Sequence, residues 1–227
     1  MTAFPGARRP VALLLSLLAA AVLMTAAAPR AAAHPHAWID VRIKVLFDKQ
    51  KRIYALEETW IFDPLYTAFS LEGVKRDKNG APDQKVLDAL MQVNMNNVKA
   101  FDYMTQVVSD GAKSKFSGVR DVKSSEKNKR LLLTFTLLLD KPVNPAKGPV
   151  EYAVFDPTYY IEMLHAEGGG AIELVGADPS CNYRLIPPNP NPNAVAFAAS
   201  IDYTHASTSG LGELFAEHVI IRCGGKP

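Results

Sequence analysis

Two histidines separated by one proline are the residues whose types and spacing most directly suggest chemistry. If a leader is removed after Ala33, the mature chain begins with His34-Pro35-His36. The free amine and ring of His34 could then chelate a metal ion, and His36 could add a third nitrogen, as in a copper-binding histidine brace. Pro35 excludes the amino-terminal copper and nickel motif that needs an ionisable amide at position two, because proline has no N–H.

The first 33 residues have the three parts of a secretory signal peptide. An arginine pair gives a positive start, residues 11–28 form an apolar run rich in Leu and Ala, and small residues precede the cleavage site. We expect cleavage after Ala33, export to the periplasm by the general secretory route, and a mature domain of residues 34–227. A retained membrane anchor is the alternative, because the run approaches the ~20 residues that span a bilayer.

Removal of this leader changes the charge balance. The precursor has 25 basic and 23 acidic side chains, and residues 1–33 contain three of the basic ones and none of the acidic ones. The mature domain therefore has 22 basic and 23 acidic side chains, a formal net charge of −1. We expect no nucleic-acid partner, because that function needs a concentrated basic face.

The two cysteines, Cys181 and Cys223, lie near the carboxyl end of the chain. In an oxidising compartment an even pair favours a disulfide. A pair of thiolate metal ligands is the alternative, but an oxidising compartment works against free thiols.

The residues around the histidines alternate in polarity. Apolar side chains at every second position from 37 to 47 predict a half-buried strand. His34, His36 and Asp40 would then share the face turned away from the core. A second strand over residues 53–62 would form a hairpin with the first.

Strands also dominate the rest of the mature chain. We expect an α+β fold of mostly antiparallel sheet with a few helices, in a single compact domain with one disulfide. A helix over residues 83–98 would bury a stripe of five apolar side chains, namely Val86, Leu87, Leu90, Met91 and Val93. The expected strands include an edge strand at 116–122, a central one at 131–139, one at 150–155 that 161–164 could continue, and short ones at 171–175, 182–186 and 215–222.

Two neighbouring carboxylates in the second strand would point to opposite faces. Glu57 and Glu58 alternate in the pleat, so one of them must meet the core or need a partner. An Asp-Pro pair also ends a strand twice, at Asp63 and at Asp156. The simpler interpretation is that both cap the following turn, and the alternative is a duplicated unit that brings two carboxylates to one end of a sheet.

Further metal ligands would have to come from later in the chain. His165 is the best additional nitrogen, because it lies between Asp156-Pro157 and a glycine turn where a side chain can reach across. Asp40, Asp63 and Asp156 are candidate oxygen ligands or partners of the ligands, with capping or solvation as their ordinary roles. Ordinary structural positions are expected for the remaining histidines, His205 and His218.

No catalytic constellation is convincing. The sequence has no Gly-x-Ser-x-Gly elbow, no His-Glu-x-x-His helix and no free reactive cysteine beyond the expected disulfide pair. We therefore do not expect an enzyme from the residues alone.

Four stretches resemble one bacterial family in the right order across nearly the whole mature chain. They are HPHAWID at 34–40, TWIFD at 59–63, VFDPTYY at 154–160 and LGELFAE at 211–217, the last leading to Cys223. The family is that of the periplasmic components of uncharacterised ABC-type transport systems, a domain of unknown function (DUF1007). The resemblance implies an association with transition-metal transporters. His34, His36, Asp156 and both cysteines lie in matching stretches, whereas His165 rests on the argument from the residues.

The sequence thus predicts a periplasmic transition-metal-binding accessory protein of a metal transport system. Nickel, cobalt, zinc or copper would be its ion, and inner-membrane transporter components its partners. Two alternatives stay open, an exported copper enzyme with a histidine brace and a metal-free scaffold that contacts a membrane transporter.

Overall fold

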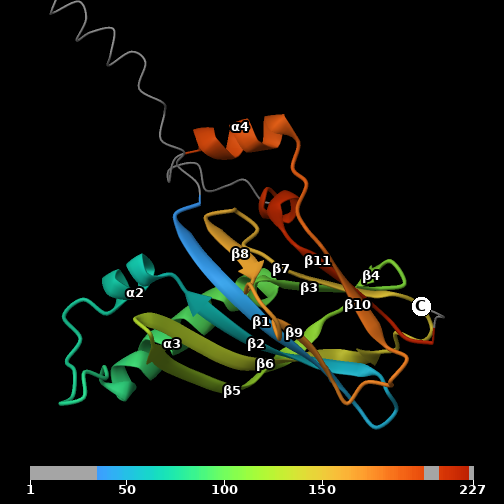
Figure 1. Ribbon diagram of the computed structural model, residues 1–227, viewed down its shortest axis with the longest axis horizontal. Helices are drawn as coiled ribbons and strands as arrows, with labels where there is room; N and C mark the ends of the chain where they lie inside the picture. The colour runs from blue at the N-terminus through green and yellow to red at the C-terminus, as the bar shows by residue number, and fades with distance from the viewer. Residues whose placement is uncertain (1–34, 202–209, 225–227) are drawn as a thin grey trace, which may run out of the picture. The chain divides into compact units, whose positions relative to one another are not determined.

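The strand that follows the paired histidines lies inside the larger of two β-sheets (Figure 1). The computed structural model describes residues 35–201 and 210–224. β1 (Ala37–Phe47) pairs in antiparallel fashion with β2 (Ile53–Phe62), which confirms the predicted hairpin. On its other side β1 pairs in parallel with two short strands from much later in the chain, β8 (Ile161–His165) and β9 (Ile172–Val175).

Alternate side chains of β1 face the core, as the sequence predicts. Trp38 on the opposite face is 45% exposed, and Lys44 on that face is also exposed. The residues on the core face of β1 are only 0 to 8% exposed: Ala37, Ile39, Val41, Ile43, Val45 and Phe47. The pleat of a strand produces this alternation, and it leaves Asp40 on the open face.

Two long strands complete the larger sheet beyond β2. β6 (Arg130–Val143) pairs with β2, and β5 (Phe116–Lys127) pairs with β6 at the edge. The apolar run at 131–139 lies within β6 and is buried on its inner face, so its interior position is confirmed. β5 is largely exposed and carries several charged side chains, which protect an edge strand from further pairing.

A second, antiparallel sheet lies against the inner face of the first. Its strand order is β10-β11-β7-β3-β4. The members are β3 (Thr105–Ser109), β4 (Ala112–Lys113), β7 (Val150–Val154), β10 (Asn182–Ile186) and β11 (His218–Arg222). A disulfide joins Cys181, just before β10, to Cys223, just after β11, which confirms the predicted pairing.

The segment after β7 differs from the prediction. Residues 161–164 do not continue β7; as part of β8 they cross to the first sheet and pair with β1. The chain turns at Asp156-Pro157, where Tyr159 has a φ of 60°. Proline cannot donate to a ladder of strand hydrogen bonds, so the turn ends β7 and redirects the chain.

The longest helix, α3 (Gln84–Val98), covers part of the core and begins after the N-cap Asp83. Its buried side chains are Leu87, Met91, Met95 and Val98. The predicted stripe was wrong at Val86 and Val93, which are 43% and 55% exposed, because the helix packs along the line of residues four apart that starts at Leu87. The shorter helices are α2 (Pro64–Ser70), α4 (Pro192–Ser200) and the 3₁₀ turns η1 (Lys99–Met104) and η3 (Gly212–Phe215).

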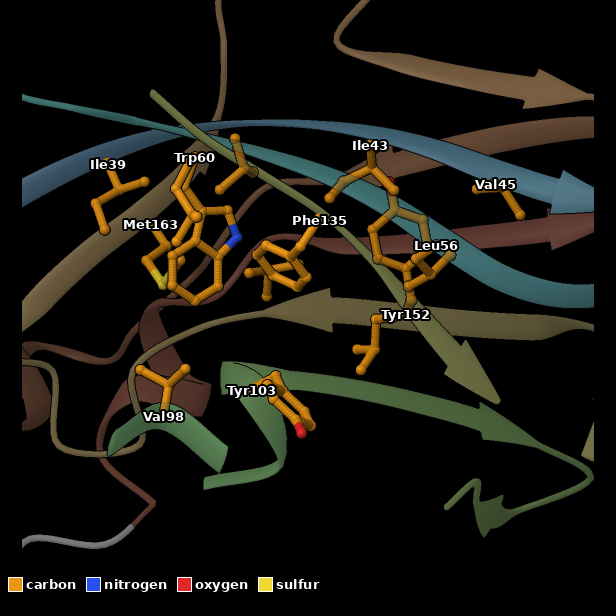
Figure 2. Close-up of a cluster of buried hydrophobic side chains, with 14 of the residues drawn as sticks. Ile39, Ile43, Val45, Leu56, Trp60, Val98, Tyr103, Phe135, Tyr152 and Met163 are labelled. Atoms are coloured by element: carbon orange, nitrogen blue, oxygen red, sulfur yellow. The ribbon is translucent and has the colours of Figure 1, made fainter. Parts of the chain in front are cut away.

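Aromatic side chains fill the space between the two sheets (Figure 2). Trp60 from β2 and Phe135 from β6 meet edge to face with ring centroids 5.2 Å apart. Tyr152 from β7 and Tyr103 from η1 enter the same core from the other layer. Edge-to-face packing of this kind stabilises a core beyond simple burial.

One carboxylate lies within this apolar core. Glu58 on β2 is 0% exposed and accepts hydrogen bonds from Trp60 Nε1 and Thr105 Oγ1, each 2.9 Å away. Glu57, on the open face, pairs with Lys44 at 2.8 Å. The prediction that one of these two glutamates must meet the core is thus confirmed. Burial raises the pKa of Glu58 from its usual 4.5 to about 7, against the effect of its two donors.

The protein should therefore lose stability as Glu58 ionises. The folded state binds this proton more tightly than the unfolded chain does, so the contribution to the free energy of unfolding is full below pH 4.5 and is lost as pH rises towards 7. Glu58→Gln mimics the protonated side chain. We expect it to raise the free energy of unfolding at pH 8 by about 3 kcal/mol and to leave it nearly unchanged at pH 4.5.

Urea unfolding between pH 4.5 and 8 measures this difference. Glu57→Gln is the matched control, because it removes a neighbouring carboxylate from an exposed ion pair and should change stability by less than about 1 kcal/mol at either pH. Equal pH profiles for wild type and Glu58→Gln would contradict the account of Glu58.

Candidate functional site

His36 lies at the end of the larger sheet where β1 begins. The backbone N–H of His36 donates to the carbonyl of Tyr160 at 2.9 Å, and the two side-chain rings lie 4.6 Å apart. His36 is exposed and stands directly before the first strand. His34 and His205 lie outside the described residues, so the chelate predicted for His34 stays a prediction.

The two Asp-Pro aspartates flank this strand start. Asp63 caps α2 by accepting from the N–H groups of Leu65 and Tyr66, and its other oxygen accepts from the Trp38 N–H at 3.1 Å. Asp156 accepts from the N–H and hydroxyl of Thr158 and from the Ile161 N–H. Both carboxylates hold backbone N–H groups at the same end of the sheet, which favours the capping interpretation.

Asp40 forms an ion pair with an arginine on the open face of the sheet. Its carboxylate pairs with Arg130 Nη1 at 2.6 Å. The same guanidinium donates to the carbonyls of Ile61 and Phe62 at the end of β2. Asp40 thus anchors an arginine that links β1, β2 and β6. The carboxylate of Asp40 therefore has a structural partner within the sheet.

His165 has hydrogen-bond partners on both ring nitrogens. Nδ1 lies 2.8 Å from a carboxylate oxygen of Glu217, and Nε2 lies 3.0 Å from the hydroxyl of Tyr152. The imidazole side chain is only 4% exposed, and Glu217 also accepts from the His165 backbone N–H at 2.6 Å. We call Tyr152, His165 and Glu217 the histidine relay.

The electrostatics of the relay follow from burial and hydrogen bonding. Burial alone would raise the pKa of Glu217, but the hydrogen bonds from the ring and backbone of His165 outweigh it and hold that pKa below its usual value. Burial, with a smaller contribution from the Glu58 carboxylate, raises the pKa of Tyr152. Glu217 therefore stays ionised and Tyr152 stays protonated, so the relay acts as an ordered chain of polar groups in the core.

Sequence reasoning missed Tyr152 and Glu217 as partners of His165, and Thr105 as the partner of Glu58. Tyr152 occupies an inward position of a short apolar strand, and Glu217 is part of the LGELFAE stretch. Neither residue is close enough to His165 in sequence to form a recognisable motif with it. Glu217 lies 52 residues away in sequence, so only the fold brings it to the imidazole.

Four of the five predicted metal ligands, His36, Asp40, Asp156 and His165, lie in the described part of the chain. Among residues 35–201 and 210–224, no group of three His, Cys, Asp or Glu side chains is arranged to hold a metal ion. Asp40, Asp156 and His165 each hold another group instead, and metal binding by them stays a prediction. His218, in β11, pairs with Glu151 at 2.7 Å on a partly exposed surface.

A family comparison accounts for nearly the whole chain. Residues 18–223 match the family described as "Protein of unknown function (DUF1007)". The chain belongs to the DUF1007 family. The description as a transport component goes further than this match, and we treat it below as part of a proposal.

A curated relative extends the comparison to another organism. An uncharacterized protein of Haemophilus influenzae is 26% identical over 193 residues, which cover 84% of this chain and 91% of the relative. The match therefore spans most of both proteins and reflects a shared domain. The disulfide of this DUF1007 member fits an exported protein. Of the helices that the structure describes, none is long and apolar enough to cross a membrane.

Replacement of His165 should damage folding. In His165→Leu the buried Tyr152 hydroxyl and the Glu217 carboxylate lose their shared partner, so we expect the free energy of unfolding to fall by about 3 kcal/mol. His218→Leu is the control, since its ion pair is partly exposed and should contribute less than about 1 kcal/mol. Urea unfolding at pH 7 measures both variants, and similar losses would show that the relay has no special structural role.

Proposed function

We propose that this DUF1007 member is an exported, transition-metal-binding accessory protein of a metal transport system. Its metal site would form at the mature amino terminus from His34 and His36. The observation that carries the proposal is the position of His36, which is exposed and immediately precedes the first strand. A residue two positions earlier can therefore bring its amine and ring to the same ion.

The donor set explains the accessory role. The amine and imidazole of His34 and the imidazole of His36 supply three nitrogens, a set that binds copper, nickel, cobalt or zinc with affinities in the Irving–Williams order. Three donors leave coordination positions for the ligands of a partner. An ion held in this way can be passed on, which suits delivery to the inner-membrane components of a transporter.

The other candidate metal ligands already have structural roles in the fold. The carboxylates of Asp63 and Asp156 cap backbone N–H groups, Asp40 pairs with Arg130, and His165 belongs to the relay. Recruiting any of them to a metal would leave a cap or a buried group without its partner.

Metal titration of the exported protein tests the site. Intact mass should first give a chain that starts at His34. Isothermal titration with Cu²⁺ and with Ni²⁺ should then show one equivalent bound, and His34→Ala and His36→Ala should each weaken binding at least tenfold. His218→Ala is the matched histidine control and should bind as wild type does.

A further variant isolates the terminal amine. One alanine inserted between Ala33 and His34 leaves both imidazoles in place but moves the amine one residue away, so we expect a similar loss of affinity. Unchanged affinity in the two histidine variants would overturn the site. Co-purification with a membrane partner that survives chelator treatment and replacement of both histidines would favour a metal-free scaffold instead.

A further inference from the structure

An apolar hollow lies beside the start of β1, next to His36. It has a volume of about 420 Å³. We call it the aromatic groove, and its main lining residues are His36, Leu65, Tyr66, Phe69, Tyr160 and Ile161. One wall is therefore helix α2, and the other is the segment that leads into β8.

Helix α2 turns its large apolar side chains outward. Leu65 and Phe69 are each 75% exposed, and their spacing of four residues places them on the same side of the helix. The helix is held to the core by other residues, because Thr67 is buried and the ring of Tyr66 stacks on Phe62 at 4.9 Å. The sequence of α2 contains no charged residue. Two large side chains exposed together in this way mark an interaction surface.

A second exposed apolar area lies on α4. Val195 and Phe197 on α4 are each 49% exposed, and α4 also contains no charged residue. Tyr159, which packs with the buried side of α4, directly precedes Tyr160 of the groove. Residues 159–160 therefore connect the buried side of α4 with the wall of the groove.

The sequence before β1 indicates what covers this surface. The apolar run of residues 11–28 ends eight residues before His36, a distance of at most about 29 Å for an extended chain. Before the expected cleavage after Ala33, an apolar run that lies in a membrane would keep His36 within that distance of the bilayer. Uncharged helices with exposed Leu and Phe beside tyrosines also have the composition that favours the lipid–water interface.

We propose that the aromatic groove docks this protein on the surface of a lipid bilayer. Leu65 and Phe69 enter the headgroup region, and Tyr160 lies at its boundary with water. Docking of this kind depends on apolar contact more than on charge, so it depends little on salt. It would hold His36 at the membrane surface, but it requires no metal and is independent of the proposed metal site.

Binding to protein-free vesicles tests the proposal. The mature protein is mixed with large unilamellar vesicles of phosphatidylethanolamine and phosphatidylglycerol at a ratio of about 3:1, and the bound fraction is measured by sedimentation. We expect wild type to bind, with less than a twofold change between about 50 and 500 mM salt. Leu65→Gln/Phe69→Gln should reduce the partition coefficient at least tenfold.

The matched control replaces a valine and a phenylalanine that are exposed elsewhere. Val93 is 55% and Phe101 is 50% exposed, so Val93→Gln/Phe101→Gln removes a similar apolar surface and should bind as wild type does. Circular dichroism confirms that both double variants are folded. Equal loss in the control, absence of wild-type binding, or binding only to native membranes that contain protein would overturn the proposal; the last result would identify a membrane protein as the occupant.

Discussion

Every second side chain of β1 is excluded from water, and the rest of the fold follows from that constraint. A strand buried on one face and flanked on both edges must find backbone partners for all its N–H and C=O groups. The hairpin with β2 supplies one edge locally. The other edge is supplied only when the chain returns more than a hundred residues later as β8 and β9. The turn at Asp156-Pro157 matters because it sends the chain back to that open edge.

Buried polar groups join the two sheets at chosen points. Glu58 from the first sheet meets Thr105 from the second, and His165 from the first meets Tyr152 from the second. Apolar layers alone tolerate many relative positions, since hydrophobic burial has no direction. A buried carboxyl or imidazole left without its partner is costly, so these hydrogen bonds favour one alignment of the sheets. The imidazole of His165, which the sequence suggested as a metal ligand, therefore helps to align the two sheets.

Local patterns predicted much of this fold. The alternation in β1, the turn capped by Asp63 and the disulfide between Cys181 and Cys223 depend on neighbouring residues or on a single pair. The destination of β8 could not be predicted in this way, because a short strand of mixed polarity fits either sheet. The face of α3 was misjudged for a related reason: apolar residues surround much of that helix, and the tertiary packing selects which of them are buried.

The candidate site shows the same division. The exposed position of His36 follows from the period of β1, and the capping roles of Asp63 and Asp156 follow from the Asp-Pro pairs. The partners of His165 are Tyr152 in β7 and Glu217 just before β11, and no motif spacing connects either residue to the histidine. Neither sequence periodicity nor motif spacing can predict long-range contacts of this kind.

The late position of β8 in the chain also sets an order of events during folding. The predicted cleavage site is only three residues ahead of β1, and a peptidase must bind that region in an extended form. Until residues 161–175 have been made, β1 has no partner on its second edge. If the chain is exported as proposed, a leader would be removed while the start of β1 is still accessible. A fold with pairing of such long range closes slowly, so the topology of the sheet keeps this edge open until late in folding.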